Sequence, residues 1–194
     1  MVNNIKLVLP FLVFEFKDDF YYLQILQRKK ENPQLGSNSR VIKNYYITSQ
    51  EYLLERYDEI MKLCEVFNAR ASIRLNKRSF EKVGFKAMTN LANTMMNKEY
   101  SFLKSSYDRA CGLGHNDSEK KWILDIDGEV SYGRLMLMED VINRAQPEGK
   151  NTIVYIPSKS GLHLITKPFD LREFGSLYPE IEVHKDNPTN LYIP

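Results

Sequence analysis

Apolar positions recur along the chain with two periodicities, one typical of helices and one that alternates as in strands. Apolar residues spaced three and four apart predict amphipathic helices, because that spacing lines one side of a helix. Thr48 and Glu51 form a capping-box pattern before the first helical stretch, and Ser79 can cap the second. The stretches with helical spacing are residues 52–68, 79–97, 100–111 and 132–145, with a shorter helix predicted at 171–174.

Runs rich in β-branched and aromatic residues predict strands between these helices. Residues 8–16 and 20–27 flank a polar tripeptide and predict a β-hairpin, while the polar segments 29–40 and 112–121 predict exposed loops. Further strands are predicted at residues 41–47, 69–75, 122–127, 152–156, 161–166, 181–183 and 191–193. Because helices and strands are interleaved and hairpins join several strands, the pattern predicts an α+β fold with mixed or antiparallel sheets flanked by helices.

Composition narrows the class of protein without naming a function. The formal net charge is only +2, which excludes a polycationic surface over the whole molecule and requires any basic binding surface to be local. Two cysteines are too few for a disulfide framework, which favours a reducing, cytoplasmic compartment. The apolar run 7–16 is broken by Pro10 and Glu15 and is shorter than the roughly 20 residues that span a bilayer, so we expect no membrane association. No linker divides the chain, and residues 1–194 should form a single compact domain.

Asp125 and Asp127 form the most informative pattern in the chain. They follow the apolar run 122–124 at the end of a predicted buried strand. Side chains alternate across a strand, so both carboxylates project from the same face. Adjacent carboxylates repel each other unless a cation lies between them, and oxygen ligands of this kind suit Mg²⁺ or Mn²⁺. The alternative is a strand that runs into an ordinary Asp-Gly turn, with both acids solvated.

A small polar turn downstream has the composition of a phosphate-binding loop. It joins two predicted strands and contains, with the histidine that follows it, Ser158, Lys159, Ser160, Gly161 and His163. Backbone N–H groups, two hydroxyls and a lysine can all donate to phosphate oxygens. The imidazole of the histidine adds another donor to the same phosphate. The alternative is a plain hairpin with a surface lysine and a packed histidine.

Two later acids are candidates for a third metal ligand. Glu182 lies between apolar residues in a short predicted strand, where a carboxylate without a partner is unfavourable. A salt bridge to a nearby lysine is the alternative to metal ligation by this residue. Asp170 precedes a predicted helix, and a role as its N-cap competes with a role as a ligand.

Taken together and in this order, the motifs resemble those of the archaeo-eukaryotic primase superfamily, the primase–polymerase catalytic core. Residues 125–127 are similar to the Asp-x-Asp strand end of that family. Residues 160–163 are similar to its Ser-x-His or Gly-x-His hairpin motif. Residues 181–183 resemble its third motif, an acid within an apolar strand, and residues 191–194 resemble the apolar strand that follows.

The resemblance covers residues 69–194 and implies an RRM-like catalytic core in that part of the chain. Residues 1–68 match no family and are expected to form an N-terminal α/β subregion. The implied activity is template-directed joining of nucleoside triphosphates, as in a DNA primase or polymerase, by two-metal-ion catalysis. The implied cofactor is Mg²⁺ or Mn²⁺.

The resemblance also implies roles for the residues already singled out. Asp125, Asp127 and Glu182 would hold one or two divalent ions. The turn residues and His163 would grip the triphosphate of the incoming nucleotide. The implied partners are nucleoside triphosphates and a single-stranded DNA or RNA template, with a helicase or initiation factor acting in trans. A small catalytic core of this kind suits a phage or mobile element.

A basic strand and turn provide candidate contacts to nucleic acid. The strand over residues 69–75 alternates basic and apolar positions, and a polar turn follows it. The residues concerned are Arg70, Arg74, Asn76, Lys77 and Arg78. We expect them to contact phosphates of the template or of the nucleotide. The alternative is a solvated face of the sheet.

Three other functions are compatible with parts of the pattern. An Asp-x-Asp-Gly sequence after an apolar run also resembles the haloacid-dehalogenase-type phosphatases, although that family needs a later acidic pair that is missing here. A metal-dependent nuclease would use clustered acids in the same way. A catalytically degenerate member of the primase family would bind single strands through aromatic and basic surfaces. Dependence of nucleoside triphosphate binding on a divalent ion separates a polymerase core from the binding protein.

Overall fold

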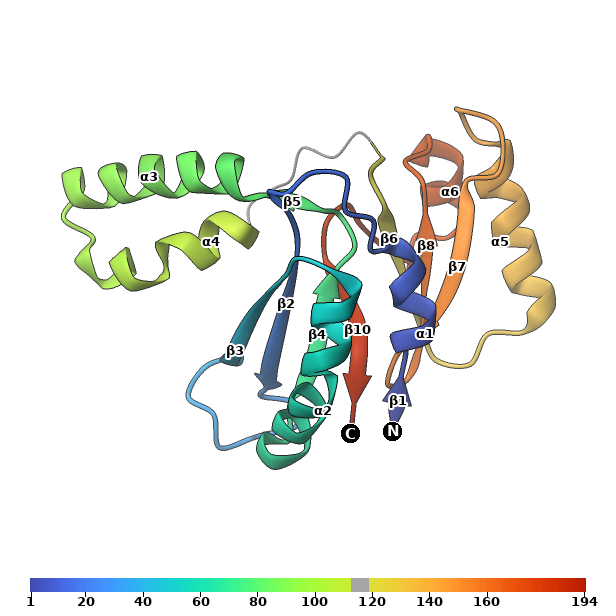
Figure 1. Cartoon of the computed structure of the whole chain (residues 1–194). Helices are drawn as coiled ribbons and strands as arrows, with labels where there is room; N and C mark the ends of the chain where they lie inside the picture. The colour runs from blue at the N-terminus through green and yellow to red at the C-terminus, as the bar shows by residue number, and fades with distance from the viewer. Residues whose placement is uncertain (113–118) are drawn as a thin grey trace.

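Two antiparallel β-sheets with flanking helices form the fold in the computed structural model, which describes residues 1–112 and 119–194 (Figure 1). The first elements in chain order are β1 (Val2–Asn3), α1 (Ile5–Val8), η1 (Leu9–Phe11), β2 (Asp19–Arg28), β3 (Ser39–Ile47), α2 (Gln50–Phe67), β4 (Arg70–Arg74), β5 (Arg78–Ser79), α3 (Phe80–Met96), η2 (Tyr100–Ser105) and α4 (Ser106–Gly112). The remaining elements are β6 (Trp122–Asp127), α5 (Tyr132–Arg144), β7 (Thr152–Pro157), β8 (Gly161–Thr166), α6 (Leu171–Leu177), β9 (Glu182–His184) and β10 (Pro188–Ile193).

The larger sheet has six strands and draws on both ends of the chain. Its order is β1-β10-β4-β2-β3, with β5 paired to β2, and every pairing is antiparallel. Residues 1–68 and residues 69–194 therefore share one sheet. Helix α2 packs its buried side, which includes Leu53 and Ile60, into the same apolar cluster as Ile73 of β4.

The smaller sheet has four antiparallel strands in the order β7-β8-β6-β9. Leu124 and Ile126 of β6 pack into an apolar cluster with buried residues of α5 and α6, and these helices lie beside the sheet in Figure 1. Ile123 of β6 belongs instead to the cluster that contains the buried residues of α2. The alternation of β6 thus separates a helix-covered face from a face directed toward the larger sheet. Asn4 links the two sheets, because its side-chain amide donates to the carbonyls of Pro157 and Asn190 at 2.8 and 2.9 Å.

Helix α3, η2 and α4 form a helical arm that projects from the larger sheet on the side away from α5 (Figure 1). Ser79 caps α3, since its hydroxyl accepts a hydrogen bond from the backbone N–H of Lys82 at 3.1 Å. Part of the arm's apolar surface is exposed, including Phe85, Met88 and Met95. Of the helices in the described ranges, none has both the length and the apolar character that crossing a membrane requires.

The α+β class with antiparallel sheets and flanking helices is confirmed, but the predicted strand over residues 8–16 is wrong. Residues 5–11 form α1 and η1 instead, and β2 forms its hairpin with β3. Pro10 lies in the first turn of η1, where its missing N–H costs no hydrogen bond. Val8 and Leu12 are both fully buried and four residues apart, a spacing that suits a helix as well as a strand.

Two smaller expectations also need correction. The N-cap of α2 is Ser49 rather than Thr48, since the Ser49 hydroxyl accepts from the backbone N–H of Tyr52 at 3.0 Å. The predicted exposed loop over residues 29–40 contains the buried Asn32, whose side chain donates to the carbonyl of Asn68 at 2.9 Å. Most of the predicted loop over residues 112–121 lies outside the described residues.

Candidate active site

The register of the smaller sheet brings three predicted site residues into line. Asp125 on β6 is the direct partner of His163 on β8 and of Glu182 on β9. Directly opposed residues of antiparallel strands project from the same face, with Cβ atoms roughly 4.5–5.5 Å apart. Asp127, two positions further along β6, projects from this face as well and pairs with Gly161. The four strand positions therefore form one contiguous polar surface, which we call the acid face.

The acid face exists because β6 is buried on its other side. Leu124 and Ile126 are almost completely inaccessible, which fixes the alternate positions toward the larger sheet. Ile123 is buried within the shared core, the Asp125 side chain is 36% exposed, and Asp127 is exposed. Along this face the strand thus runs from the buried core to solvent, and its carboxylates lie at the solvent-exposed end.

His163 is held on two sides and is largely buried, with 12% of its side chain exposed. Its Nδ1 atom lies 2.8 Å from the hydroxyl of Thr189 on β10, and its Nε2 atom lies 3.5 Å from Oδ1 of Asp125. Burial lowers the pKa of His163 below its ordinary value, although the nearby carboxylate of Asp125 acts in the opposite direction. The imidazole is therefore neutral at pH 7 and carries one N–H. A Thr189 hydroxyl that donates to Nδ1 leaves the Nε2 proton facing Asp125.

Glu182 has a histidine partner of its own. Nε2 of His184 lies 3.3 Å from its carboxylate, and 77% of the Glu182 side chain is exposed. The salt bridge to lysine that the sequence left open is thus replaced by a contact to histidine. Sequence reasoning missed His184, although its spacing of two from Glu182 on a strand indicates that both share one face. Asp170, the competing third acid, caps α6 by accepting from the backbone N–H of Arg172 at 3.0 Å.

The acid face has the donor chemistry for a hard divalent ion. Asp125, Asp127 and Glu182 offer carboxylate oxygens from adjacent strand positions, and Mg²⁺ and Mn²⁺ prefer such ligands. In residues 1–112 and 119–194, no three His, Cys, Asp or Glu side chains form a group that could hold a metal ion in their present conformations. The backbone positions suit an ion ligated by carboxylates, while the side chains of Asp125 and Glu182 each contact a different histidine.

The polar turn between β7 and β8 is locked against the end of β6. The backbone N–H of Gly128 donates to the carbonyl of Ser160 at 2.8 Å, and the N–H of Ser158 donates to the carbonyl of Gly161 at 2.9 Å. A Cβ atom at position 161 would lie 2.1 Å from the carbonyl oxygen of Ile126. Glycine is therefore required at this position by close approach of the two backbones. The turn is held beside Asp127, and Lys159 and Ser160 are exposed on it.

Arg70 is the member of the predicted basic group whose charge reaches the acid face. Its guanidinium makes a small contribution to the lowered pKa of His163, after the larger effects of burial, Asp125, His184 and Asp127. Arg70 also donates to both carboxylate oxygens of Glu31 at 3.0 Å, and Lys159 donates to the same carboxylate at 2.7 Å. One acid from the connection between β2 and β3 thus joins two residues predicted to bind phosphate.

The other members of the basic group have partners within the protein. Arg74 and Arg78 lie 3.5 and 2.6 Å from the carboxylate of Asp186, and Arg78 is completely buried. The side-chain amide of Asn76 donates to the backbone carbonyl of Lys121 at 2.9 Å. Lys77 lies 3.1 Å from the carboxylate of Asp19. These contacts give the four residues a structural role, and their predicted role in phosphate binding stays a prediction.

Two residues of the site had no local sequence signal. Glu31 lies in a polar segment next to Lys29 and Lys30, where an acid suggests only a solvated charge. Thr189 reaches His163 only because β10 lies at the junction of the two sheets. Both contacts join residues distant in sequence, and a single sequence does not reveal such pairs.

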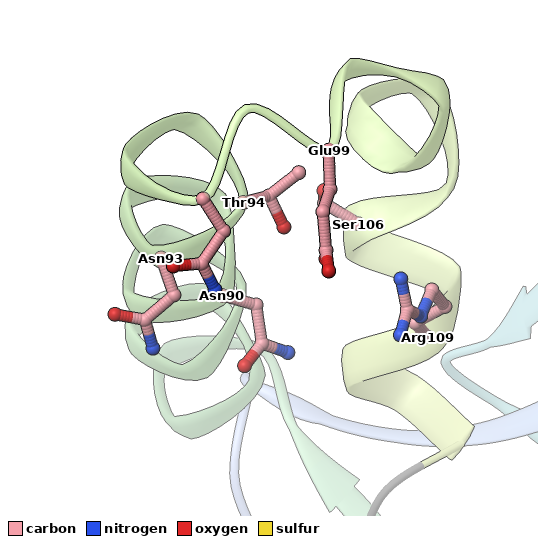
Figure 2. Close-up of a pocket in the computed structure, with 7 residues that line it drawn as sticks. Asn90, Asn93, Thr94, Glu99, Ser106 and Arg109 are labelled. Atoms are coloured by element: carbon pink, nitrogen blue, oxygen red, sulfur yellow. The ribbon is translucent and has the colours of Figure 1, made fainter.

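A separate polar pocket lies between α3 and the η2–α4 segment of the helical arm. Figure 2 shows the side chains that line it. The labelled residues are Asn90, Asn93, Thr94, Glu99, Ser106 and Arg109. Amides and hydroxyls predominate, so the pocket lacks the concentration of acids found on β6. Its position on the projecting arm separates it from the acid face (Figure 1).

No family model matches this sequence, and comparison with curated proteins and with solved structures likewise finds no significant match.

Proposed function

We propose that the chain is a template-directed nucleotidyltransferase of the primase–polymerase type, which joins nucleoside triphosphates with the help of two divalent ions. The observation that carries the proposal is the register of β6. Asp125 is flanked by His163 on one neighbouring strand and by Glu182 on the other. The three motifs that resemble the primase–polymerase set are far apart along the chain. Their residues nevertheless have adjacent backbone positions in the fold.

The carboxylates of Asp125, Asp127 and Glu182 would hold the ions. Bound there, Mg²⁺ or Mn²⁺ would lower the pKa of a 3′-hydroxyl and neutralise charge on the triphosphate. The exposure of Asp127 and Glu182 supports this assignment, because a nucleotide and an ion must reach them from solvent. The half-buried Asp125 lies deeper and is fixed by its two strand neighbours.

The remaining residues of the site would bind and orient the triphosphate. The 3′-oxygen forms a bond to the α-phosphorus, the bond to the β-phosphate oxygen breaks, and pyrophosphate leaves while the hydroxyl proton passes to solvent. Neutral His163 would donate from Nε2 to a phosphate oxygen, and Thr189 fixes the orientation of its ring. Ser158, Lys159 and Ser160 would add donors from the turn, so positioning would account for much of the rate.

The finer fold assignment belongs to the same proposal. We assign residues 69–194 to an RRM-like primase–polymerase core, supported by the antiparallel order of β6, β8 and β9 and by α5 packed behind them. Residues 1–68 would complete the second sheet of that core. The proposed partners are nucleoside triphosphates and a single-stranded DNA or RNA template, with a helicase or initiation factor in trans. A cytoplasmic protein encoded by a phage or mobile element fits this role.

Primer extension tests the proposal. Wild-type protein and the Asp125→Asn/Asp127→Asn double variant are compared on a primed single-stranded template, with Mg²⁺ and with Mn²⁺. We expect the double substitution to reduce extension at least about a hundredfold, since it removes two of the three carboxylates proposed to hold the divalent ions. Asp140→Asn is the matched control. This exposed acid of α5 lies 3.5 Å from Arg144, and its loss should leave extension unchanged.

The outcomes separate the competing functions. Folded wild-type protein that extends no primer with either ion contradicts the proposal. Cleavage of the template would then favour a nuclease, and release of phosphate from a monoester would favour a phosphatase. Template binding that needs no ion would favour a binding protein without catalysis. If extension occurs, unprimed templates and the two nucleotide types decide whether the protein starts chains and whether it makes DNA or RNA.

A further inference from the structure

Glu31 occupies a position between two cations at the edge of the acid face. Arg70 on β4 donates to both of its carboxylate oxygens, and Lys159 in the β7–β8 turn donates to one of them. The side chain of Glu31 is only 9% exposed, and that of Arg70 is 12% exposed. Lys159 is 56% exposed and closes the arrangement on the solvent side. A carboxylate thus lies in a cradle formed by a guanidinium and an ammonium group.

The segment that carries Glu31 is anchored on its other side. The side-chain amide of Asn68, at the end of α2, donates to the backbone carbonyl of Glu31 at 3.0 Å. Asn32 donates to the carbonyl of Asn68 at 2.9 Å, and Gln27 donates to the carbonyl of Phe67 at 2.6 Å. These contacts are made by the backbone and by neighbouring side chains. They tether the segment to the end of α2, and the contacts of Glu31 with Arg70 and Lys159 restrain it further.

The cradle has the features of a phosphate site. A guanidinium that faces two oxygens matches carboxylate and phosphate geometry equally well, and a lysine provides a further point charge. Burial alone would raise the pKa of Glu31, but the hydrogen bonds from Arg70 and Lys159 outweigh it and lower the pKa below its ordinary value. Glu31 is therefore an anion at neutral pH, and a phosphate group would compete with it for the same donors.

The cradle is close to the proposed reaction site. Lys159 belongs to the turn that is hydrogen-bonded to the end of β6, next to Asp127. We propose that Arg70 and Lys159 form a phosphate subsite that Glu31 fills in the resting protein, and that a phosphate of the incoming nucleoside triphosphate displaces Glu31. The identity of the nucleotide rests on the proposed function; the competition between a carboxylate and a polyphosphate does not.

Binding of inorganic tripolyphosphate without divalent ions tests the proposal by calorimetry. We expect Glu31→Gln to bind tripolyphosphate about tenfold more tightly than the wild type, because the neutral amide no longer competes for both cations. Lys159→Gln in the Glu31→Gln background should remove most of that gain. Asp127→Asn is the charge-matched control, since it removes a nearby negative charge without touching the cradle. An equal gain in Asp127→Asn and Glu31→Gln, or no gain in the latter, overturns the proposal.

Hydrogen exchange on the wild type provides a measurement that needs no variant and remains informative if Glu31→Gln folds poorly. Displacement of Glu31 should speed amide exchange in residues 29–38 when tripolyphosphate is bound. Unchanged or slower exchange in this segment would contradict displacement. The assay uses neither template nor metal, so a failure of the polymerase proposal leaves it intact. Conversely, if the protein extends primers but Glu31→Gln does not change tripolyphosphate binding, only the proposed competition between Glu31 and phosphate is refuted.

Discussion

The two sheets use charged residues in opposite ways. Around β4 and β5 of the larger sheet, Arg74 and Arg78 share Asp186, and Lys77 contacts Asp19. On the acid face of the smaller sheet, the two carboxylate–histidine contacts of Asp125 and Glu182 are 3.5 and 3.3 Å long.

The difference separates charges that hold the fold together from charges that remain accessible to a ligand. Arg78 is completely buried, and the Lys77 and Asp19 side chains are largely buried. Loss of a charged partner therefore strongly destabilises the folded state. Asp127 and Glu182 are exposed to solvent, which makes their folding role small. In this protein most of the basic row is therefore engaged within the fold, whereas Asp127 and Glu182 remain accessible to solvent.

Breaking the Asp186 network should have the largest effect on stability. Asp186→Asn leaves the buried guanidinium of Arg78 without its counter-charge, and we expect a loss of about 3–5 kcal/mol in the free energy of unfolding. Asp125→Asn on the acid face should change that free energy by less than about 1 kcal/mol. Urea denaturation of both variants measures the difference. Similar losses for the two would remove the distinction between the sheets.

A substitution at Gly161 tests how tightly the turn between β7 and β8 is fixed. The Cβ of Gly161→Ala would meet the carbonyl of Ile126, so we expect a loss of about 1–3 kcal/mol as the two backbones separate. Gly84→Ala in α3 is the matched control, because a Cβ there meets no atom within 4 Å. It should stabilise the protein by about 0.5–1 kcal/mol through higher helix propensity. Thermal unfolding measures both, and a neutral Gly161→Ala would contradict the close approach.

The contact between His163 and Thr189 tests how much a single hydrogen bond at the smaller sheet contributes to stability. Thr189→Val keeps the volume but removes the hydroxyl partner of Nδ1, and we expect a loss of about 1 kcal/mol. Imidazole nitrogen chemical shifts should also report a mixture of tautomers in place of one. Thr166→Val is the control, because the buried Thr166 hydroxyl has no hydrogen-bond partner among the described residues. That variant should be neutral or more stable, and equal losses would argue against a special role for Thr189.

The smallest expected effect is a contribution of Asp19 to the pH dependence of stability, which is visible only at acidic pH. Burial would raise its pKa, but hydrogen bonds from the backbone N–H groups of Phe16 and Glu15, together with Lys77, lower it below the ordinary 3.8. The unfolded chain then binds the proton more tightly, so the stabilisation is present above pH 3.8 and is lost as the pH falls through the folded pKa. Asp19→Asn should flatten this part of the stability profile. Urea unfolding between pH 2 and pH 6 measures it, and an identical slope in the variant would contradict the assignment.

Local signals in the sequence predicted many elements correctly. Alternation and flanking turn residues located β8 at its observed bounds, and Ser79 marked the start of α3. Helix α2 ends at Phe67, close to the predicted end, and Asn68 caps it in the left-handed conformation that asparagine tolerates. These features depend on neighbours within a few residues, so they can be recognised without the fold.

The errors arose where distant contacts decided the local conformation. Residues 8–16 have a composition that suits a strand, but the hydroxyl of Tyr21 donates to the carbonyl of Phe11 at 2.9 Å and accepts from the N–H of Val13 at 3.1 Å. The Tyr21 side chain of β2 thus forms hydrogen bonds with backbone groups that would otherwise pair with a neighbouring strand. The loop predicted to be exposed over residues 29–40 contains the largely buried Glu31 for the same reason, because its partners Arg70 and Lys159 are remote in sequence.

The sequence by itself determined which side chains share a face, since alternation along a strand follows from backbone geometry alone. It placed Asp125 with Asp127, and the acid strand against apolar positions that had to be buried. Only the tertiary structure decided the register that sets Asp125 between His163 and Glu182, and the junction that brings Thr189 to the imidazole. Register depends on pairing between segments far apart in the chain, where burial of many side chains at once, and no single local preference, selects one alignment.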